Sequence, residues 1–172
     1  MKIRNSIFGL ICLAGAIALI SIMAFQFNPN QSRYEPILMT RAEMEASVVL
    51  YDAQPIESPG KIWIYNDFIL LIEKYRGIHI LDNSDPEALE VVAFIQVDGC
   101  TDLAMKDGII YANNAVDIIA IDGKTNFGSI EVVSRNRNVL PMVASVEEWN
   151  DYYYINQLPS DMIIVRWIPN QD

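Results

Sequence analysis

The feature that most constrains this chain is an internal repeat of forty residues. Sliding the sequence by 40 positions aligns IYNDFILLIEKYRGIHILDN (64–83) with AMKDGIIYANNAVDIIAIDG (104–123) without a gap. Asp82 falls on Asp122, and apolar positions coincide at most of the remaining places. Self-similarity at a fixed period is typical of an array built from one repeated structural unit. The sequence therefore predicts two copies of the same unit in a row.

Each copy predicts four short antiparallel strands, because β-branched and aromatic runs alternate with Asn, Asp and Gly. The pair Asp107-Gly108 predicts a tight hairpin, since glycine tolerates the positive φ that such a turn needs. Four strands in about 40 residues is the period of a propeller blade. The expected strands are 61–65, 68–73, 77–82 and 90–96 in the first copy, and 101–106, 108–113, 116–122 and 130–134 in the second.

The number of copies limits what the repeat can form. Residues 61–140 hold the two copies, and residues 141–172 are expected to hold a degenerate third copy or tail, because DYYYIN (151–156) and MIIVRWI (162–168) resemble two strands of the repeat. Propellers use about 4–8 blades. The expected fold class is therefore all-β: two to three four-stranded antiparallel propeller-type blades in an incomplete propeller. Uncovered blade faces and strand edges favour pairing with other chains.

The first 26 residues predict a helix that is a signal anchor or a signal peptide. Nineteen residues from Ile7 to Phe25 contain one serine as their only strongly polar member, and about 20 apolar residues cross a bilayer core. Lys2 and Arg4 precede this run, which indicates a cytoplasmic N-terminus. Both alternatives export the rest of the chain. We therefore expect an exported, membrane-anchored protein with its β-region on the periplasmic or extracellular side.

Residues 27–60 predict a linker that contains one short helix. The stretch QFNPNQSRYEP (26–36) is polar and holds two prolines. Further on, Thr40 is followed three residues later by Glu43, which is the pattern of a capping box. A helix of about two turns is therefore expected from Arg41.

The formal charge of −10 excludes one class of partner. Nucleic-acid binding depends on Lys and Arg side chains that neutralise phosphates, so no nucleic-acid partner is expected. The expected partner is instead an unknown protein or a second copy of the chain. Cys12 and Cys100 lie far apart and predict no intrachain disulfide framework. Cys100 is interpreted as a half-buried free thiol, with an intermolecular bridge as the alternative.

The acidic stretch DNSDP (82–86) raises the question of a metal site. A calcium loop needs several oxygen ligands at set spacing, and neither the glycine at its sixth position nor the glutamate at its twelfth is present here. The stretch is therefore interpreted as a turn in which Asp82, like Asp122, bonds its own backbone and ends a strand. No metal site and no cofactor are predicted.

Two groups of residues are candidates for binding. The segment EKYR (73–76) is expected at a hairpin tip, where loops on rigid scaffolds often bind ligands. The tail is rich in aromatic residues, which commonly anchor interfaces. His79 is the only histidine and is interpreted as structural, and no catalytic set is predicted. The candidate binding residues are Glu73, Tyr75, Arg76, Trp149 and Tyr153.

The strand ends IHILD (78–82) and IIAID (118–122) resemble the motif of the bacterial LVIVD-repeat family of β-propeller proteins. The flanking PGKIWI, EKYRGIHILDNSDP and YANNAVDIIAID are similar to the opening portion of exported members of that family, so the resemblance covers about residues 36–140. It implies a propeller fold, export and a binding role, without an established catalytic set. Members of the family are typically much longer than this chain.

Two functional hypotheses follow. The first is an exported, membrane-tethered β-repeat module that mediates protein–protein or surface interactions without catalysis. The second is a carbohydrate-binding module or a remnant glycan-active enzyme that uses the aromatic tail and nearby carboxylates. A glycosidase needs two carboxylates about 5–9.5 Å apart, which the sequence cannot place.

Overall fold

The computed structural model describes residues 33–145 and 155–170. The chain divides into two compact units, residues 1–32 and residues 33–172, and all described residues belong to the second. The helix expected at 1–26 therefore lies outside the described residues. Among those that are described, no helix has the length and apolar character needed to span a bilayer.

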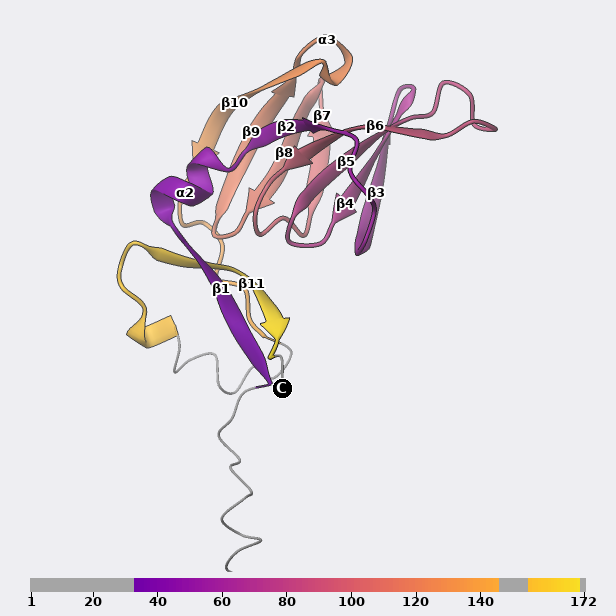
Figure 1. Cartoon of the computed structure of the whole chain (residues 1–172). Coiled ribbons are helices and arrows are strands. Elements are labelled where there is room, and N and C mark those ends of the chain that lie inside the picture. Colours follow the sequence, from indigo (N-terminus) through magenta and orange to yellow (C-terminus); the bar gives the residue numbers. More distant parts are fainter. Residues whose placement is uncertain (1–32, 146–154, 171–172) are drawn as a thin grey trace, which may run out of the picture. The chain divides into compact units, whose positions relative to one another are not determined.

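The described part of the chain is mostly β-structure with two short helices (Figure 1). All strand pairs in it are antiparallel. Its elements are β1 (Tyr34–Thr40), α2 (Arg41–Ala46), β2 (Val49–Asp52), β3 (Pro59–Tyr65), β4 (Phe68–Glu73), β5 (Gly77–Asp82), β6 (Glu90–Gln96), β7 (Leu103–Lys106), β8 (Ile109–Asn114), β9 (Asp117–Gly123), α3 (Lys124–Phe127), β10 (Ser129–Asn136) and β11 (Met162–Pro169).

The two repeat copies form two separate sheets. Sheet 1 has the strand order β2-β6-β5-β4-β3, and sheet 2 has the order β10-β9-β8-β7. The eight strands predicted from the repeat are all present, with small differences at their ends. The predicted hairpin at Asp107-Gly108 is confirmed, because φ is 52° at Asp107 and 82° at Gly108 and the turn joins β7 directly to β8.

Sheet 1 has a fifth strand that the sequence did not predict. Strand β2 pairs with β6 and lies in the segment 27–60, which was expected to be a linker with one helix. That expectation is wrong in a second place, because β1 occupies residues 34–40 of the same segment. Both strands pair with residues far along the chain, so local composition carries no sign of them. The helix itself is confirmed: Thr40 and Glu43 form both bonds of the capping box.

The degenerate third copy is not a third sheet of the same kind. Residues 162–169 form a strand as predicted, but this strand, β11, pairs only with β1 in a two-stranded sheet. Residues 155–157 are helical rather than extended. The apolar side chains of β11 are buried against β1 and the adjoining core, which explains their strand-like pattern without a third repeat. The predicted strand residues 151–154 lie outside the described residues.

The two sheets pack face to face in the same orientation. Strand β3 contacts β7 at one edge, and β2 contacts β10 at the other. The β3–β4 turn and the β7–β8 turn lie at the same end, because both line one cleft. Two sheets stacked in the same orientation must meet through opposite faces. The core between them is Leu70, Ile72, Ile78, Ile80, Ile95, Val97, Cys100, Leu103, Ile110, Ala112, Ile119, Ile121 and Phe127.

The register of the strands corrects the gapless alignment of the two copies. Asp82 lies opposite Phe68 in sheet 1, whereas Asp122 lies opposite Ile109 in sheet 2. The turn from β4 to β5 is one residue longer than the turn from β8 to β9. When Asp82 is matched to Asp122, each residue of β4 therefore corresponds to the β8 residue one position later than the gapless alignment gives. Phe68, for example, corresponds to Ile109.

A second core joins the terminal sheet to sheet 2. It contains Met44 of α2, Ala115 and Val116 of the β8–β9 turn, and Ile163 and Val165 of β11. Beside it the fully buried carboxylate of Asp117 accepts hydrogen bonds from two arginines. Arg41 Nη1 lies 2.9 Å and Arg135 Nη1 2.8 Å from Asp117 Oδ2. These contacts tie the N-terminal helix of the described unit to the second sheet.

Candidate functional site

The structure places the predicted binding residues in different environments. Glu73 is the last residue of β4 and is only 2% exposed, so it does not lie at an open tip. Tyr75 and Arg76 do lie in the β4–β5 turn, as predicted. Trp149 and Tyr153 lie outside the described residues.

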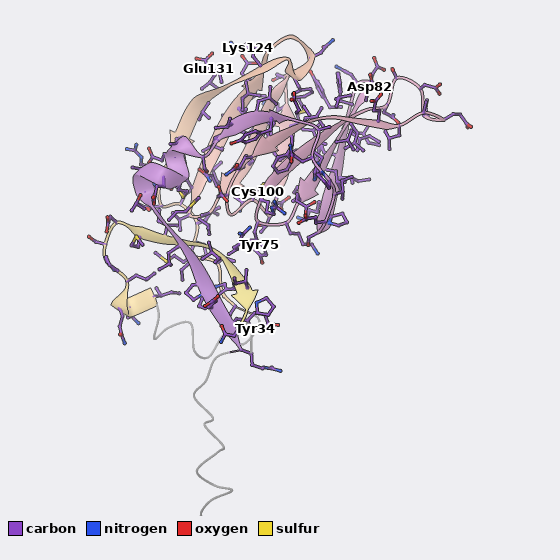
Figure 2. The ribbon with its side chains drawn as sticks, in the orientation of Figure 1. Tyr34, Tyr75, Asp82, Cys100, Lys124 and Glu131 are labelled. Carbon is purple, nitrogen blue, oxygen red and sulfur yellow. The ribbon has the colours of Figure 1, made fainter. Side chains whose placement is uncertain are left out.

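The backbone of Tyr75 is held by the loop that leads from sheet 1 to sheet 2. Its N–H donates to the carbonyl of Cys100 at 2.6 Å, and its carbonyl accepts from Gly99 N–H at 2.9 Å. Figure 2 shows Tyr75 and Cys100 close together. Cys100 is fully buried, and burial raises the pKa of its thiol to about 12. The interpretation of Cys100 as half-buried is therefore corrected, and its thiol is protonated and shielded in the folded state.

Glu73 anchors the segment that connects β2 to β3. Its carboxylate accepts hydrogen bonds from the backbone N–H groups of Glu57, at 3.0 Å, and Ser58. The N–H groups of an irregular segment have no ladder partner of their own, so a buried acceptor satisfies them. The side chain of Glu57 in turn pairs with Arg76. Residues 53–58 therefore form a strap across the outer face of sheet 1.

The same carboxylate contacts the only histidine of the chain. His79 Nε2 lies 3.1 Å from Glu73 Oε2, and His79 is fully buried. The ring also packs against Phe94, with 4.8 Å between ring centroids. Its other nitrogen, Nδ1, is buried and has no hydrogen-bond partner in the part of the chain that the structure describes.

The pKa of Glu73 is lowered by these contacts. Burial of the carboxyl raises its pKa, but hydrogen bonds from Glu57 N–H, the His79 ring and Ser58 N–H together lower it by more. Glu73 is therefore a carboxylate at neutral pH, and a carboxylate can only accept hydrogen bonds. It follows that Nε2 of His79 carries the proton of their shared hydrogen bond.

A pocket of about 310 Å³ opens above this pair. Its deepest side chains are Glu73, His79 and Phe94, which are buried, and its rim is formed by exposed residues of β2, the strap and the β4–β5 turn. The lining residues are Tyr51, Gln54, Pro55, Glu73, Arg76, His79, Phe94 and Gln96. The pocket thus presents one buried acceptor, one cation, one anion and two aromatic rings.

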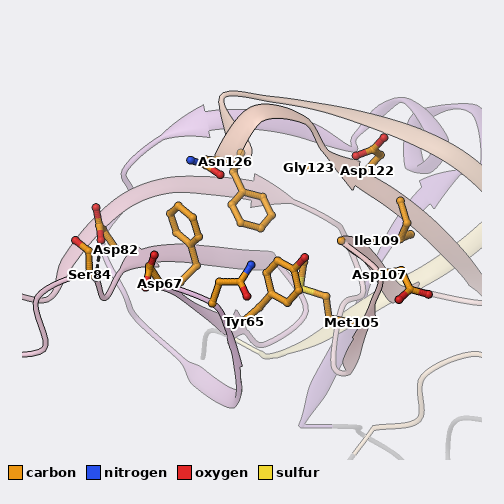
Figure 3. A pocket seen from close by; sticks show the side chains of 14 residues that line it. Tyr65, Asp67, Asp82, Ser84, Met105, Asp107, Ile109, Asp122, Gly123 and Asn126 are labelled. Carbon is orange, nitrogen blue, oxygen red and sulfur yellow. Dashed lines mark hydrogen bonds between the residues drawn. The ribbon is translucent and has the colours of Figure 1, made fainter.

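A second and larger cleft, of about 590 Å³, lies between the two sheets (Figure 3). The repeat brings four aspartates to its lining: Asp67 and Asp107 from equivalent hairpin turns, and Asp82 and Asp122 from equivalent strand ends. Their carboxylates point away from one another around the cleft. Within the described residues, no three His, Cys, Asp or Glu side chains are arranged to hold a metal ion.

The two strand-end aspartates act mainly in local structure. Asp82 Oδ1 accepts from Ser84 N–H at 2.8 Å, and this backbone hydrogen bond lowers the pKa of Asp82. The prediction that Asp82 bonds its own backbone is confirmed. Asp122 differs, because its carboxylate pairs with Lys124 at 2.8 Å. Lys124 also forms an ion pair with Glu131 (Figure 2).

The outer face of sheet 1 is strongly apolar along β3. Ile62 and Ile64 are 61% and 64% exposed and point away from the core between the sheets. By register, they correspond to Leu103 and Met105 of sheet 2, which face that core and are covered by sheet 1. Along β3, sheet 1 therefore leaves uncovered part of the face that sheet 2 buries, while the strap of residues 53–58 crosses the same face over Glu73.

The outer face of sheet 2 is its complement. By register, this outer face of sheet 2 is equivalent to the inner face of sheet 1, through which sheet 1 packs on sheet 2. Tyr111 and Ile118 lie on it and are 42% and 37% exposed. A hollow of about 320 Å³ lies on this face, lined in part by Ala104, Tyr111 and Ile118. The β3 part of the outer face of sheet 1 and the outer face of sheet 2 thus repeat part of the contact that is made inside the molecule.

Reasoning from the sequence missed the role of His79 and the contribution of Tyr51, Phe94 and Gln96. A signal for the first was present. A three-residue turn after Glu73 pairs Glu73 with Gly77. His79 lies two residues further along the neighbouring strand and therefore on the same face of the sheet as Glu73. Nothing in the sequence indicated that β2 would bring Tyr51 next to Phe94.

Comparison with known proteins adds no relative, because no family model, no curated protein and no solved structure matches this chain.

Proposed function

We propose that this chain is an exported, membrane-tethered β-repeat module of the LVIVD type, whose two sheets are blades of an incomplete propeller and whose role is protein–protein association. The occupant that we propose for its uncovered blade face is a second copy of the chain. The copies stack head to tail, with sheet 1 of one against sheet 2 of the next. No catalysis is involved.

The observation that carries this proposal is the correspondence of the two outer faces. Ile62 and Ile64 stand on the face equivalent to one that is buried in sheet 2. That buried face of sheet 2 is covered by the inner face of sheet 1. The equivalent of this covering face is the outer face of sheet 2, where Tyr111 and Ile118 lie beside a hollow. Contacts between non-identical faces of identical chains form rings or open filaments.

The association is tested with residues 33–172, because the strand pairs and both cores of the described unit draw on no residue before Arg33. Sedimentation velocity is measured from micromolar concentration to about 1 mM, where a contact worth ~4 kcal/mol is half formed. We expect a reversible, concentration-dependent increase in mass. A monomer throughout this range overturns self-association, and a different protein recovered on the same face also counts against it.

Two variants distinguish head-to-tail stacking from other contacts. Ile64→Lys disables the sheet 1 face and Tyr111→Lys disables the sheet 2 face, so each variant alone is expected to stay monomeric. A mixture of the two retains one intact face of each kind and should form a dimer that grows no further. The matched control is Leu89→Lys, which changes an exposed apolar residue in the loop before β6 and should associate normally. If the mixture stays monomeric while the wild type associates, the head-to-tail arrangement is wrong.

The tether is supported separately, by the 19-residue apolar run Ile7–Phe25 after two basic residues. Alkaline extraction of membranes from cells that express the full chain should leave it in the pellet. Protease added to the outside of intact cells, after removal of any outer envelope, should digest residues 33–172. Recovery of the chain in the cytoplasmic soluble fraction overturns this part of the proposal.

A further inference from the structure

We propose that the pocket above Glu73 and His79 binds a small, neutral, polyhydroxylated ligand, the chemistry of a single sugar ring. This inference goes beyond the association proposed above and does not depend on it. The pocket lies on the same outer face of sheet 1 as the exposed isoleucines, but it is bounded by β2, the strap, β5, β6 and the end of β4, whereas those isoleucines lie on β3.

The first step in the argument is the unsatisfied nitrogen. Nε2 of His79 donates to the Glu73 carboxylate, and no described residue offers an acceptor to Nδ1, so the geometry favours the tautomer in which Nδ1 carries no proton and is a hydrogen-bond acceptor. It is fully buried and has no partner among the described residues. A buried acceptor without a donor destabilises the folded state. A ligand that brings a hydroxyl or amide N–H to this atom recovers that loss.

The second step concerns charge. Two formal charges line the pocket, the Glu73 carboxylate and the Arg76 guanidinium, and they have opposite signs. An anionic ligand would face the buried carboxylate and could not donate to Nδ1, and a cationic ligand would face Arg76. A neutral ligand avoids both penalties.

The third step concerns the other lining groups. Arg76 is a hydrogen-bond donor. The amide nitrogen of Gln96 donates to Asp98 at 2.8 Å, so the amide oxygen of Gln96 is the group that can accept a hydrogen bond from a ligand. A ligand must therefore offer both donors and acceptors, and a hydroxyl does both. Tyr51 at the rim and Phe94 in the floor supply aromatic surface for C–H groups. A volume of about 310 Å³ limits the ligand to one or two rings.

The single histidine makes the experiment direct, because the ring nitrogen signals of the chain belong to His79 alone. Long-range ¹⁵N–¹H spectra of residues 33–172 at pH 7 should show a neutral ring with its proton on Nε2. Glucose and N-acetylglucosamine are then added as probes. We expect a saturable shift of Nδ1 with a dissociation constant on the order of 1 mM. Glucuronate and glucosamine, which keep the ring and add a negative or a positive charge, should bind at least about tenfold more weakly.

The matched variant is His79→Gln, because its amide N–H replaces Nε2 and keeps the hydrogen bond to Glu73 while Nδ1 is removed. Backbone amide shifts at Gly77–Ile80 should no longer respond to glucose, with the unfolding transition retained. Asp107→Asn, in the other cleft, should bind as wild type. The proposal is overturned if both ring nitrogens are protonated at pH 7, if neither sugar shifts Nδ1 at about 100 mM, if glucuronate binds more tightly than glucose, or if His79→Gln binds equally well.

Discussion

At the scale of single residues, hydrogen bonds stabilise the carboxylates that are buried in the folded chain. Glu73 is held by two backbone N–H groups and an imidazole, and Asp117 by two guanidinium groups and the backbone N–H of Asn138. Neither carboxylate is left without partners, which is the condition under which charges are tolerated in protein interiors. Among the described residues, two buried side-chain nitrogens have no hydrogen-bond partner, Nδ1 of His79 and Nε of Arg166, and the first of these lies beneath the pocket.

Replacement of Glu73 should change the dependence of stability on pH. The folded pKa of Glu73 lies below its ordinary value of 4.5, so its contribution to stability is present above about pH 5 and is lost as the pH falls through the folded pKa. We expect Glu73→Gln to lower the free energy of unfolding by about 1–3 kcal/mol at pH 7 and by less at pH 3.

Urea unfolding of Glu73→Gln and wild type between pH 3 and pH 8 measures this difference. Glu87→Gln, at an exposed loop position, is the control and should be nearly neutral at every pH. A loss of stability that is the same at pH 3 and pH 7 would show that the charge of Glu73 plays no part.

At the scale of elements, the turns decide how each hairpin is formed. Gly108 sits at φ 82° in the β7–β8 turn with open space around it, and only the Tyr65 hydroxyl is near its missing side chain. Gly77 begins β5 where that strand runs against β6, and a side chain there would collide with the backbone carbonyl of Ile95 and the Phe94 ring. One glycine is required by backbone conformation and the other by close approach of a neighbouring strand.

The two glycines should therefore respond differently to alanine. Gly108→Ala should cost about 1 kcal/mol, the price of a positive φ alone. Gly77→Ala should cost more than about 3 kcal/mol, because the central strands of sheet 1 must separate to admit a methyl group. Thermal unfolding of both variants tests the ranking, and equal losses would mean that the β5–β6 contact is looser than the structure has it.

At the scale of the whole molecule, Asp117 joins parts that are distant in sequence. It links α2, through Arg41, to the β9–β10 hairpin, through Arg135, beside the core shared with β11. Breaking a buried ion pair strands the remaining charges, which costs about 3–5 kcal/mol.

We therefore expect Asp117→Asn to destabilise residues 33–172 by about 3–5 kcal/mol in urea unfolding. Asp122→Asn, in the partly exposed pair with Lys124, is the control and should cost less than about 1 kcal/mol. If the two variants lose similar amounts, the network at Asp117 does not hold the terminal sheet in place.

The predictable part of the fold rests on short-range information. The strands of both repeat copies, the Asp107-Gly108 hairpin and the Thr40 cap each depend on residues within a few positions of one another. Strands β1 and β2 were not predicted, and β11 was predicted as a strand but not with its partner, because these pairings join segments distant in sequence. Of the candidate site, the turn holding Tyr75 and Arg76 was predicted, but the burial of Glu73 was not.

By itself the sequence determined that residues 61–136 form a repeated antiparallel meander, since alternation of apolar and turn residues sets strands and hairpins locally. It could not determine which faces those strands would cover. Only the tertiary structure decided that the two sheets stack through opposite faces, that a strap closes over Glu73, and that His79 lies beneath it with one nitrogen unused. These features arise from contacts between distant segments, which packing selects and local sequence does not encode.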